Sequence, residues 1–147
     1  MATHPLIAQG TLNRVRTSVV VPGSTNLNVT ASYMGKQMAR LAFEGNFADL
    51  IGTATGAVES DEPYVFATLT ISLLRTQSLS SAWLEQAQTG SGIGDVTSYS
   101  DSKVFDAVTL SGAVIQNIDP GAFDGTDPVV RVTLRGVFYV NSNLWNL

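Results

Sequence analysis

The chain has 147 residues, of which 14% are charged and 44% are hydrophobic, and its formal net charge is −4. This length suits one domain with a sizeable core, and the absence of cysteine excludes disulfide frameworks, thiol catalysis and cysteine-ligated zinc. The acidic balance disfavours tight nucleic-acid binding, which needs clustered Lys and Arg. The N-terminus lacks the pattern of a signal peptide, and no apolar run approaches the ~20 residues of a membrane helix. We therefore expect a single domain over residues 1–147 that makes no membrane contact.

The charges are unevenly distributed along the sequence. Every acidic residue lies between Glu44 and Asp127, and the acids include a compact group of Glu59, Asp61 and Glu62. One interpretation is an ordinary solvated surface. The other is that basic segments of one copy attract acidic segments of another, because opposite potentials orient association. The candidate basic residues all precede the first acid: Arg14, Arg16, Lys36 and Arg40.

The N-terminal third is predicted to be mostly strands. Alternating apolar residues predict strands over Leu12–Val21, Asn28–Tyr33 and Met38–Phe43. Gly45–Glu62 is rich in Gly, Ala and Thr and has little periodicity, so we expect a long loop or an extended hairpin. Loops of this length in compact domains are usually functional or disordered.

The most regular alternation lies between residues 64 and 74. One face is apolar and is predicted to meet the core: Val65, Ala67, Leu69, Ile71 and Leu73. The opposite face carries small hydroxyl side chains, Thr68, Thr70 and Ser72, where a strand facing bulk water usually carries charges.

A short helix is predicted next. Leu79, Trp83, Leu84 and Ala87 form one stripe at helical spacing. Ser78 or Ser80 is expected to cap its first amides, and Gly90 is expected to end it. A helix of two to three turns must pack its Trp83 face on a sheet to be stable.

The C-terminal half is predicted to hold two long antiparallel strands. Gly92–Lys103 is predicted as turns around a short strand, Val96–Tyr99. Val104–Ile118 and Val129–Val140 are predicted as strands joined by the loop Asp119–Pro128, with Gly112 marking a bulge. The core-facing residues expected in these strands are Val104, Val108, Leu110, Val114 and Ile118 in the first, and Val130, Val132, Leu134, Phe138 and Val140 in the second. The fold class is thus mainly β, a β-sandwich or open barrel of antiparallel strands with one short flanking α-helix and a long loop.

The sequence offers no arrangement typical of catalysis, cofactor binding or metal binding. The only histidine is His4, near the terminus, which argues against a Ser-His-Asp site. The glycines of Gly90–Gly94 follow a helix, whereas phosphate-binding glycines precede one. Asp119, Asp124 and Asp127 could suggest calcium, but their Asp-Gly and Asp-Pro neighbours are ordinary turn chemistry. We therefore expect neither a cofactor nor an enzymatic activity.

The order of elements resembles that of bacteriophage tail tube proteins, most closely those of contractile-tailed phages. The resemblance is strongest over residues 56–141. It rests on the strand Phe66–Gln77, the helix Ser78–Leu84, the segment Gly94–Asp101 and the closing strand Val130–Val140.

The resemblance implies a structural subunit of the virion tail, assembled in the host cytoplasm. Subunits of such tubes form hexameric rings that stack into a hollow conduit for DNA, and a long loop and the N-terminal segment reach toward neighbouring subunits. The implied partners are further copies of the chain and the tail sheath, baseplate and tail terminator proteins. Thr68, Thr70 and Ser72 would face the channel, and the pI of about 4.7 would suit a wall that repels phosphates and lets DNA pass without tight binding.

Two other functions fit the same sequence. A tube subunit of a bacterial contractile or secretion apparatus would share the fold. A stand-alone β-sandwich binding module would expose a patch of aromatic side chains; Trp83 is expected on the apolar stripe of the helix, which leaves Trp145 and the tyrosines for such a patch.

Overall fold

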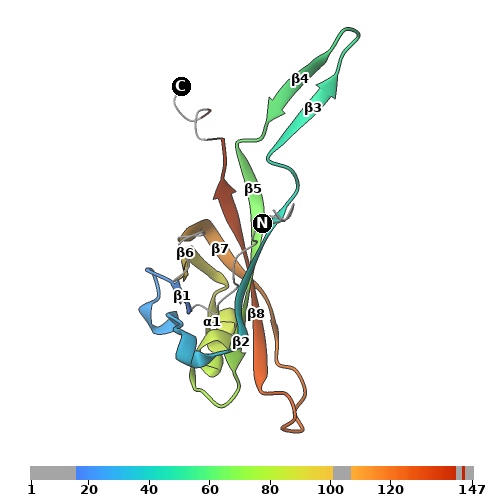
Figure 1. The fold of residues 1–147 in the computed structure, drawn as a ribbon. Coiled ribbons are helices and arrows are strands. Elements are labelled where there is room, and N and C mark those ends of the chain that lie inside the picture. The colour runs from blue at the N-terminus through green and yellow to red at the C-terminus, as the bar shows by residue number, and fades with distance from the viewer. Residues whose placement is uncertain (1–15, 101–106, 142–143, 145–147) are drawn as a thin grey trace, which may run out of the picture.

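A computed structural model describes residues 16–100, 107–141 and 144 (Figure 1). Its elements in chain order are β1 (Thr17–Val20), the 3-10 turns η1 (Thr25–Leu27) and η2 (Ala31–Tyr33), β2 (Met34–Glu44), β3 (Ala48–Gly52), β4 (Ala57–Asp61), β5 (Tyr64–Leu74), α1 (Leu79–Thr89), β6 (Gly92–Ser100), β7 (Val108–Asp119) and β8 (Val129–Tyr139).

Six strands form one antiparallel sheet in the order β1-β6-β7-β8-β5-β2, and β3 and β4 form a separate two-stranded hairpin. The sheet curls into a half-barrel, and the hairpin projects beyond it from the ends of β2 and β5 (Figure 1). The expected open barrel with antiparallel strands and one short helix is confirmed. Gly45–Glu62 was predicted to be either a long loop or an extended hairpin, and it is an extended hairpin.

The core lies on the concave face of the half-barrel. The register pairs Leu69 with Leu134 and Ile71 with Val132, which confirms the predicted core faces of β5 and β8 at these positions. Trp83 of α1 and Leu27 of η1 are fully buried in the same cluster. The indole N–H of Trp83 has no acceptor among the residues described, so this side chain contributes to the core only by packing.

The helix packs through Trp83 as predicted, but its contacts differ in detail. Leu84 is 47% exposed and Ala82 packs on the core instead, because Ala82 lies on the same side of Trp83 as the packed Leu79, whereas Leu84 lies on the other side. The side chain of Ser78 forms no capping bond, and Ser80 Oγ donates to the Gln77 carbonyl rather than accepting from an amide. The helix does end at Gly90, whose N–H donates to the Gln86 carbonyl at 2.8 Å.

The predicted bulge at Gly112 is present, and it changes which of the next residues face the core. Gly112 has φ +60, and the register of β7 against β8 shifts between Ser111 and Val114. Leu110 and Ile115 are buried, whereas Val114, predicted to face the core, is 42% exposed. The extra residue moves Val114 to the outer face, and a second irregularity between Ile115 and Asn117 returns Ile118, which was predicted to face the core, to the core side opposite Val132.

Two other elements differ from the sequence prediction. Strand β6 begins at Gly92 rather than Val96, and Gly94, with φ +76, sits at an irregularity within it. Asn28–Tyr33 is not a strand: Val29 forms a single bridge to Val19, and the chain then turns through η2. The Asn28 side chain accepts the Val21 N–H at 2.8 Å, so a side chain replaces the backbone acceptor that a continuing strand would supply. Val104, predicted to face the core, lies outside the residues described.

Candidate assembly surfaces

The most prominent surface is the β3–β4 hairpin. Its two strands pair only with each other, and residues in them are almost all exposed, including Leu50 at 71%, Ile51 at 54% and Val58 at 56%. A two-stranded hairpin alone in water is marginally stable. Three large apolar side chains are thus open to solvent on an element that stands apart from the main sheet.

The two faces of the hairpin differ in charge. Ile51 and Val58 lie directly opposite each other and share a face with the Asp49–Ser60 pair at the base. On the other face Leu50 lies opposite Glu59, and Ala48 lies opposite Asp61. A side-chain hydrogen bond with Asp61, together with repulsion from its charge, raises the pKa of Glu59. One face is thus apolar near the tip and the other is acidic.

Asn141 fixes the base of the hairpin. Its Nδ2 donates to the carbonyls of Phe47 at 2.8 Å and Glu62 at 2.7 Å, and the Glu62 N–H donates to the Phe47 carbonyl at 2.9 Å. Asn141 has φ +52, a conformation that asparagine tolerates better than most residues. Phe43 packs against Phe47 and Phe138 with centroid separations of 5.3 and 4.8 Å. The hairpin therefore leaves the sheet in a defined direction.

The candidate inter-subunit charges divide between the body and the hairpin. Arg16, directly before β1, and Arg40, in β2, are both exposed. Glu59, Asp61 and Glu62 lie on the hairpin and at its base. Arg14 is outside the residues described, and for Lys36 only the backbone is described.

The predicted hydroxyl face lies on the outer side of the sheet, away from the core. Thr68 and Thr70 are half-buried, and Thr68 Oγ1 donates to Glu44 Oε1 at 3.1 Å. Ser72 is only 8% exposed, and the backbone at Gly35 lies close to it, since a Cβ at Gly35 would come 3.8 Å from Ser72 Cβ. Thr68 and Thr70 are therefore the accessible members of this set.

The outer face is not acidic. The register places Arg40, Arg131 and Arg135 on it, together with the acids Glu44 and Asp119. Arg135 Nη2 contacts Glu44 Oε2 at 2.6 Å and its guanidinium lies 4.2 Å from the centre of the Phe66 ring. The acidic pI of the chain was expected to reflect a phosphate-repelling wall, but the acidic residues responsible for it lie in the hairpin and the loops. Composition gives the total charge of a chain and does not say which face carries it.

An apolar groove of about 610 Å³ opens on the concave side, at the end of the half-barrel nearer the hairpin. Its walls come from both edges of the sheet and include no charged side chain. The lining residues are Thr17, Ala39, Leu41, Phe43, Phe47, Leu69, Ser98, Ser100, Val108 and Phe138. Among the residues described, the core thus fills one end of the half-barrel with α1, and the groove lies at the other end.

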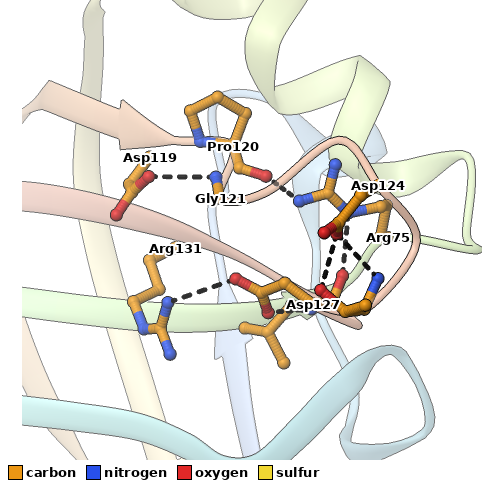
Figure 2. Close-up of polar contacts among 9 residues, drawn as sticks. Arg75, Asp119, Pro120, Gly121, Asp124, Asp127 and Arg131 are labelled. Atoms are coloured by element: carbon orange, nitrogen blue, oxygen red, sulfur yellow. Dashed lines mark hydrogen bonds and ion pairs between the residues drawn. The ribbon is translucent and has the colours of Figure 1, made fainter.

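The β7–β8 loop lies at the opposite end of the sheet and is built around Arg75 (Figure 2). Arg75 Nε donates to the Asp127 carbonyl at 3.0 Å, Nη2 donates to the Pro120 carbonyl, and the guanidinium lies 5.5 Å from the centre of the Phe123 ring. Phe123 is 84% exposed.

The acidic residues of this loop form local turns, as predicted. Asp119 accepts the Gly121 N–H, Asp124 accepts from both the N–H and the hydroxyl of Thr126, and Asp127 accepts the Val129 N–H. The bonds from Thr126 lower the pKa of Asp124. In the described part of the chain no group of three or more His, Cys, Asp or Glu side chains is placed to hold a metal ion.

The groove, the bonds from Asn141 at the base of the hairpin and the bonds from Arg75 to the β7–β8 loop were not predicted from the sequence. Each joins residues far apart in the chain, such as Phe47 with Asn141 and Arg75 with Asp127. The sequence did contain one signal of the groove: Ser98 and Ser100 place hydroxyls on the side of β6 that carries the buried Val96. Small polar side chains on a core-facing side indicate that the core does not fill that region.

No helix among the residues described is long and apolar enough to cross a membrane. No protein-family model matches the sequence, and no curated protein is similar to it.

Three solved structures are similar to this chain. A chain from the virion of a native gene transfer agent particle aligns with a TM-score of 0.52 at 9% identity, over 84% of this chain and 95% of that one. A chain from the tube-terminating cap of the anti-feeding prophage aligns at 0.48 with 13% identity (93% and 97% covered), and one from the baseplate of the anti-feeding prophage aligns at 0.44 with 14% identity (92% and 95% covered). The half-barrel with its short helix is therefore a fold found in a phage-like particle.

Proposed function

We propose that the chain is a non-enzymatic structural subunit of a phage tail tube, which forms hexameric rings that stack into a hollow conduit for DNA. The observation that carries the proposal is the projecting β3–β4 hairpin, whose strands have exposed apolar side chains and pair with no other strand of the described chain. The fold shared with a chain of a gene transfer agent virion supports a virion component.

Lateral contacts are proposed to involve the edges of the sheet. Strand β2 forms one edge and pairs only with β5 in the described chain. An unpaired edge of this length invites pairing with another chain. A contact between two different surfaces of identical subunits closes into a ring when the rotation allows it, whereas stacking produces an open filament. Charge attraction between the Arg16 and Arg40 side of one copy and the Glu59, Asp61 and Glu62 group of another would orient these contacts.

The outer face of β5 is proposed to line the channel through Thr68 and Thr70. Two of the arginines on this face have acidic partners: Arg135 pairs with Glu44, and Arg131 lies 4.0 Å from Asp127. A guanidinium that is already paired gains less from a phosphate, since its counter-charge must first be displaced. This pairing supports transient passage of DNA without tight binding. Sheath, baseplate and tail terminator proteins are the proposed partners in the virion.

Negative-stain microscopy combined with light scattering tests the proposal on the purified full-length chain. We expect rings or tubes with a central hole, and a scattering mass that rises with protein concentration. A chain that stays monomeric at high concentration, with and without a preformed tail end as an initiator, would contradict the proposal.

A further inference from the structure

We propose that the apolar groove of one copy is the seat for the Ile51–Val58 face of the hairpin of a second copy. The inference rests on the proposed function and adds to it the receiving surface for the hairpin. It joins two apolar surfaces that are exposed in the part of the chain that the structure describes.

The groove is suited to an apolar strand rather than to a charged partner. Its lining combines the aromatic rings of Phe43, Phe47 and Phe138 with the hydroxyls of Thr17 and Ser98, and no charged side chain contributes. A volume of about 610 Å³ is large enough for several side chains. The hydroxyls leave some hydrogen-bonding capacity for an incoming backbone.

The charge of the hairpin selects which of its faces enters. Seating the Leu50 face would carry Glu59 and Asp61 into a groove that offers no basic partner, and burial of an unpaired carboxylate is costly. The Ile51–Val58 pair brings two uncharged β-branched side chains, and the one acid on that face, Asp49, lies at the Asp49–Ser60 pair nearer the base. The acidic face is then left turned away from the groove and accessible to basic residues.

A hairpin cannot fill the groove of its own chain. Phe47 lines the groove and immediately precedes β3. Five residues of strand carry the tip about 17 Å away from that point, and Figure 1 shows the hairpin pointing away from the half-barrel. The contact must therefore be between copies, and because it joins two different surfaces it can propagate from copy to copy.

Cysteine cross-linking tests the contact directly, because the chain contains no cysteine of its own. The full-length Val58→Cys and Ser98→Cys variants are prepared separately, mixed under assembly conditions and treated with a short bismaleimide. We expect a covalent dimer in the mixture at a yield roughly tenfold above that of either variant alone, because proximity raises the effective thiol concentration. Equal yields in the mixture and in the single variants would overturn the proposal.

The Leu50→Cys variant mixed with Ser98→Cys is the matched control, since Leu50 lies on the opposite face of the same hairpin. We expect this pair to give no more dimer than the single variants. A yield equal to that of the Val58 pair would mean that the face assignment is wrong.

An assembly measurement complements the cross-linking. The Ile51→Thr/Val58→Thr double variant keeps β-branched side chains and removes much of the apolar surface. We expect the protein concentration needed for assembly to rise roughly tenfold, whereas Leu50→Thr should change it little. An unchanged concentration for the double variant would overturn the proposal.

Failure of the inference and failure of the proposed function are distinguishable. Tubes that form without the Val58–Ser98 cross-link would reject the groove as the seat and leave the tube function standing. Cross-linked dimers or short chains without rings or tubes would support the contact and reject the tube. A chain that never self-associates at any concentration would reject both.

Discussion

Glu44 connects three strands of the sheet at the level of single residues. From β2 its carboxylate accepts the Thr68 hydroxyl on β5 and the Arg135 guanidinium on β8, at 3.1 and 2.6 Å. The hydrogen bond from Arg135, then that from Thr68, holds the pKa of Glu44 below its usual value of 4.5. A carboxyl whose pKa is lower in the folded state stabilises the fold above the unfolded pKa, and this contribution disappears as the pH falls through the folded pKa.

Glu44→Gln should therefore flatten the acid side of the stability profile. The wild type is expected to lose stability as the pH falls below about 4.5, whereas the variant lacks this component of the loss. Urea midpoints measured between about pH 7 and about pH 3 check the difference. Glu85→Gln, at an exposed carboxyl on α1, is the control and should keep the wild-type slope. A Glu44→Gln profile parallel to the wild type would show that the ion pair adds nothing to stability.

Gly136 shows how one missing side chain accommodates the bulge of β7. It lies buried in β8 opposite the bulge, where a Cβ would come 2.8 Å from Leu110 Cβ and 3.4 Å from Ala113 Cα. The first of these distances is shorter than real Cβ contacts, so any side chain here forces the strands to shift.

Gly136→Ala is expected to destabilise the fold by about 1–3 kcal/mol, the usual cost of overpacking a core. Urea denaturation of the purified variant measures the change in the free energy of unfolding. Gly92→Ala is the matched control, because no atom lies within 4 Å of its Cβ position, and it should stay within about 0.5 kcal/mol of the wild type. Similar losses for both variants would show that steric overlap is not the cause.

At the level of elements, the hairpin and the half-barrel differ in what stabilises them. The half-barrel has a continuous core that includes Trp83 and the central residues of β5 and β8. The hairpin has its own ladder and the bonds at its base through Asn141. Local opening is easiest where few buried apolar contacts resist it. We therefore expect the hairpin to open independently of the rest of the sheet.

Asn141→Gly tests this independence. Glycine keeps φ +52 accessible and removes only the amide that donates to Phe47 and Glu62. Amide exchange in residues 48–61 should accelerate roughly tenfold while the melting temperature hardly changes. Asn117→Asp, at an exposed amide on β7, is the control. If exchange in the hairpin stays at the wild-type rate, Asn141 does not hold the hairpin.

At the scale of the whole molecule, folding and assembly are assigned to different parts of the chain. The buried core contains no residue of β3 or β4, whereas the proposed contacts between copies depend on them. The two ends of the hairpin are already joined by the bond from the Glu62 N–H to the Phe47 carbonyl. The element can therefore be removed with little disturbance to the sheet.

A variant in which a single glycine replaces Ala48–Asp61 should fold and fail to assemble. Its urea midpoint is expected near that of the wild type, since the deleted side chains make no contribution to the core. Sedimentation and light scattering should report a monomer at concentrations where the full-length chain forms larger particles. Normal tubes from the shortened chain would contradict the assignment of assembly to the hairpin.

The sequence by itself determined the strands with strict alternation, the helix and the fold class. The core faces of β5 and β8 follow from a period of two, and burial of Trp83 follows from a short helix that needs a sheet to pack on. The turn chemistry of Asp119, Asp124 and Asp127 is also local and was predicted. These features depend on residues close together in the chain.

Tertiary structure alone decided the features that join distant residues. The bulge at Gly112 was predicted, but the exposure of Val114 depends on how β7 pairs with β8. The outer face gathers Arg40, Arg131 and Arg135 from two strands although the chain is acidic, because strand pairing and not composition sets the charge of a face. The groove is likewise formed by both edges of a curled sheet, and no single segment contains it.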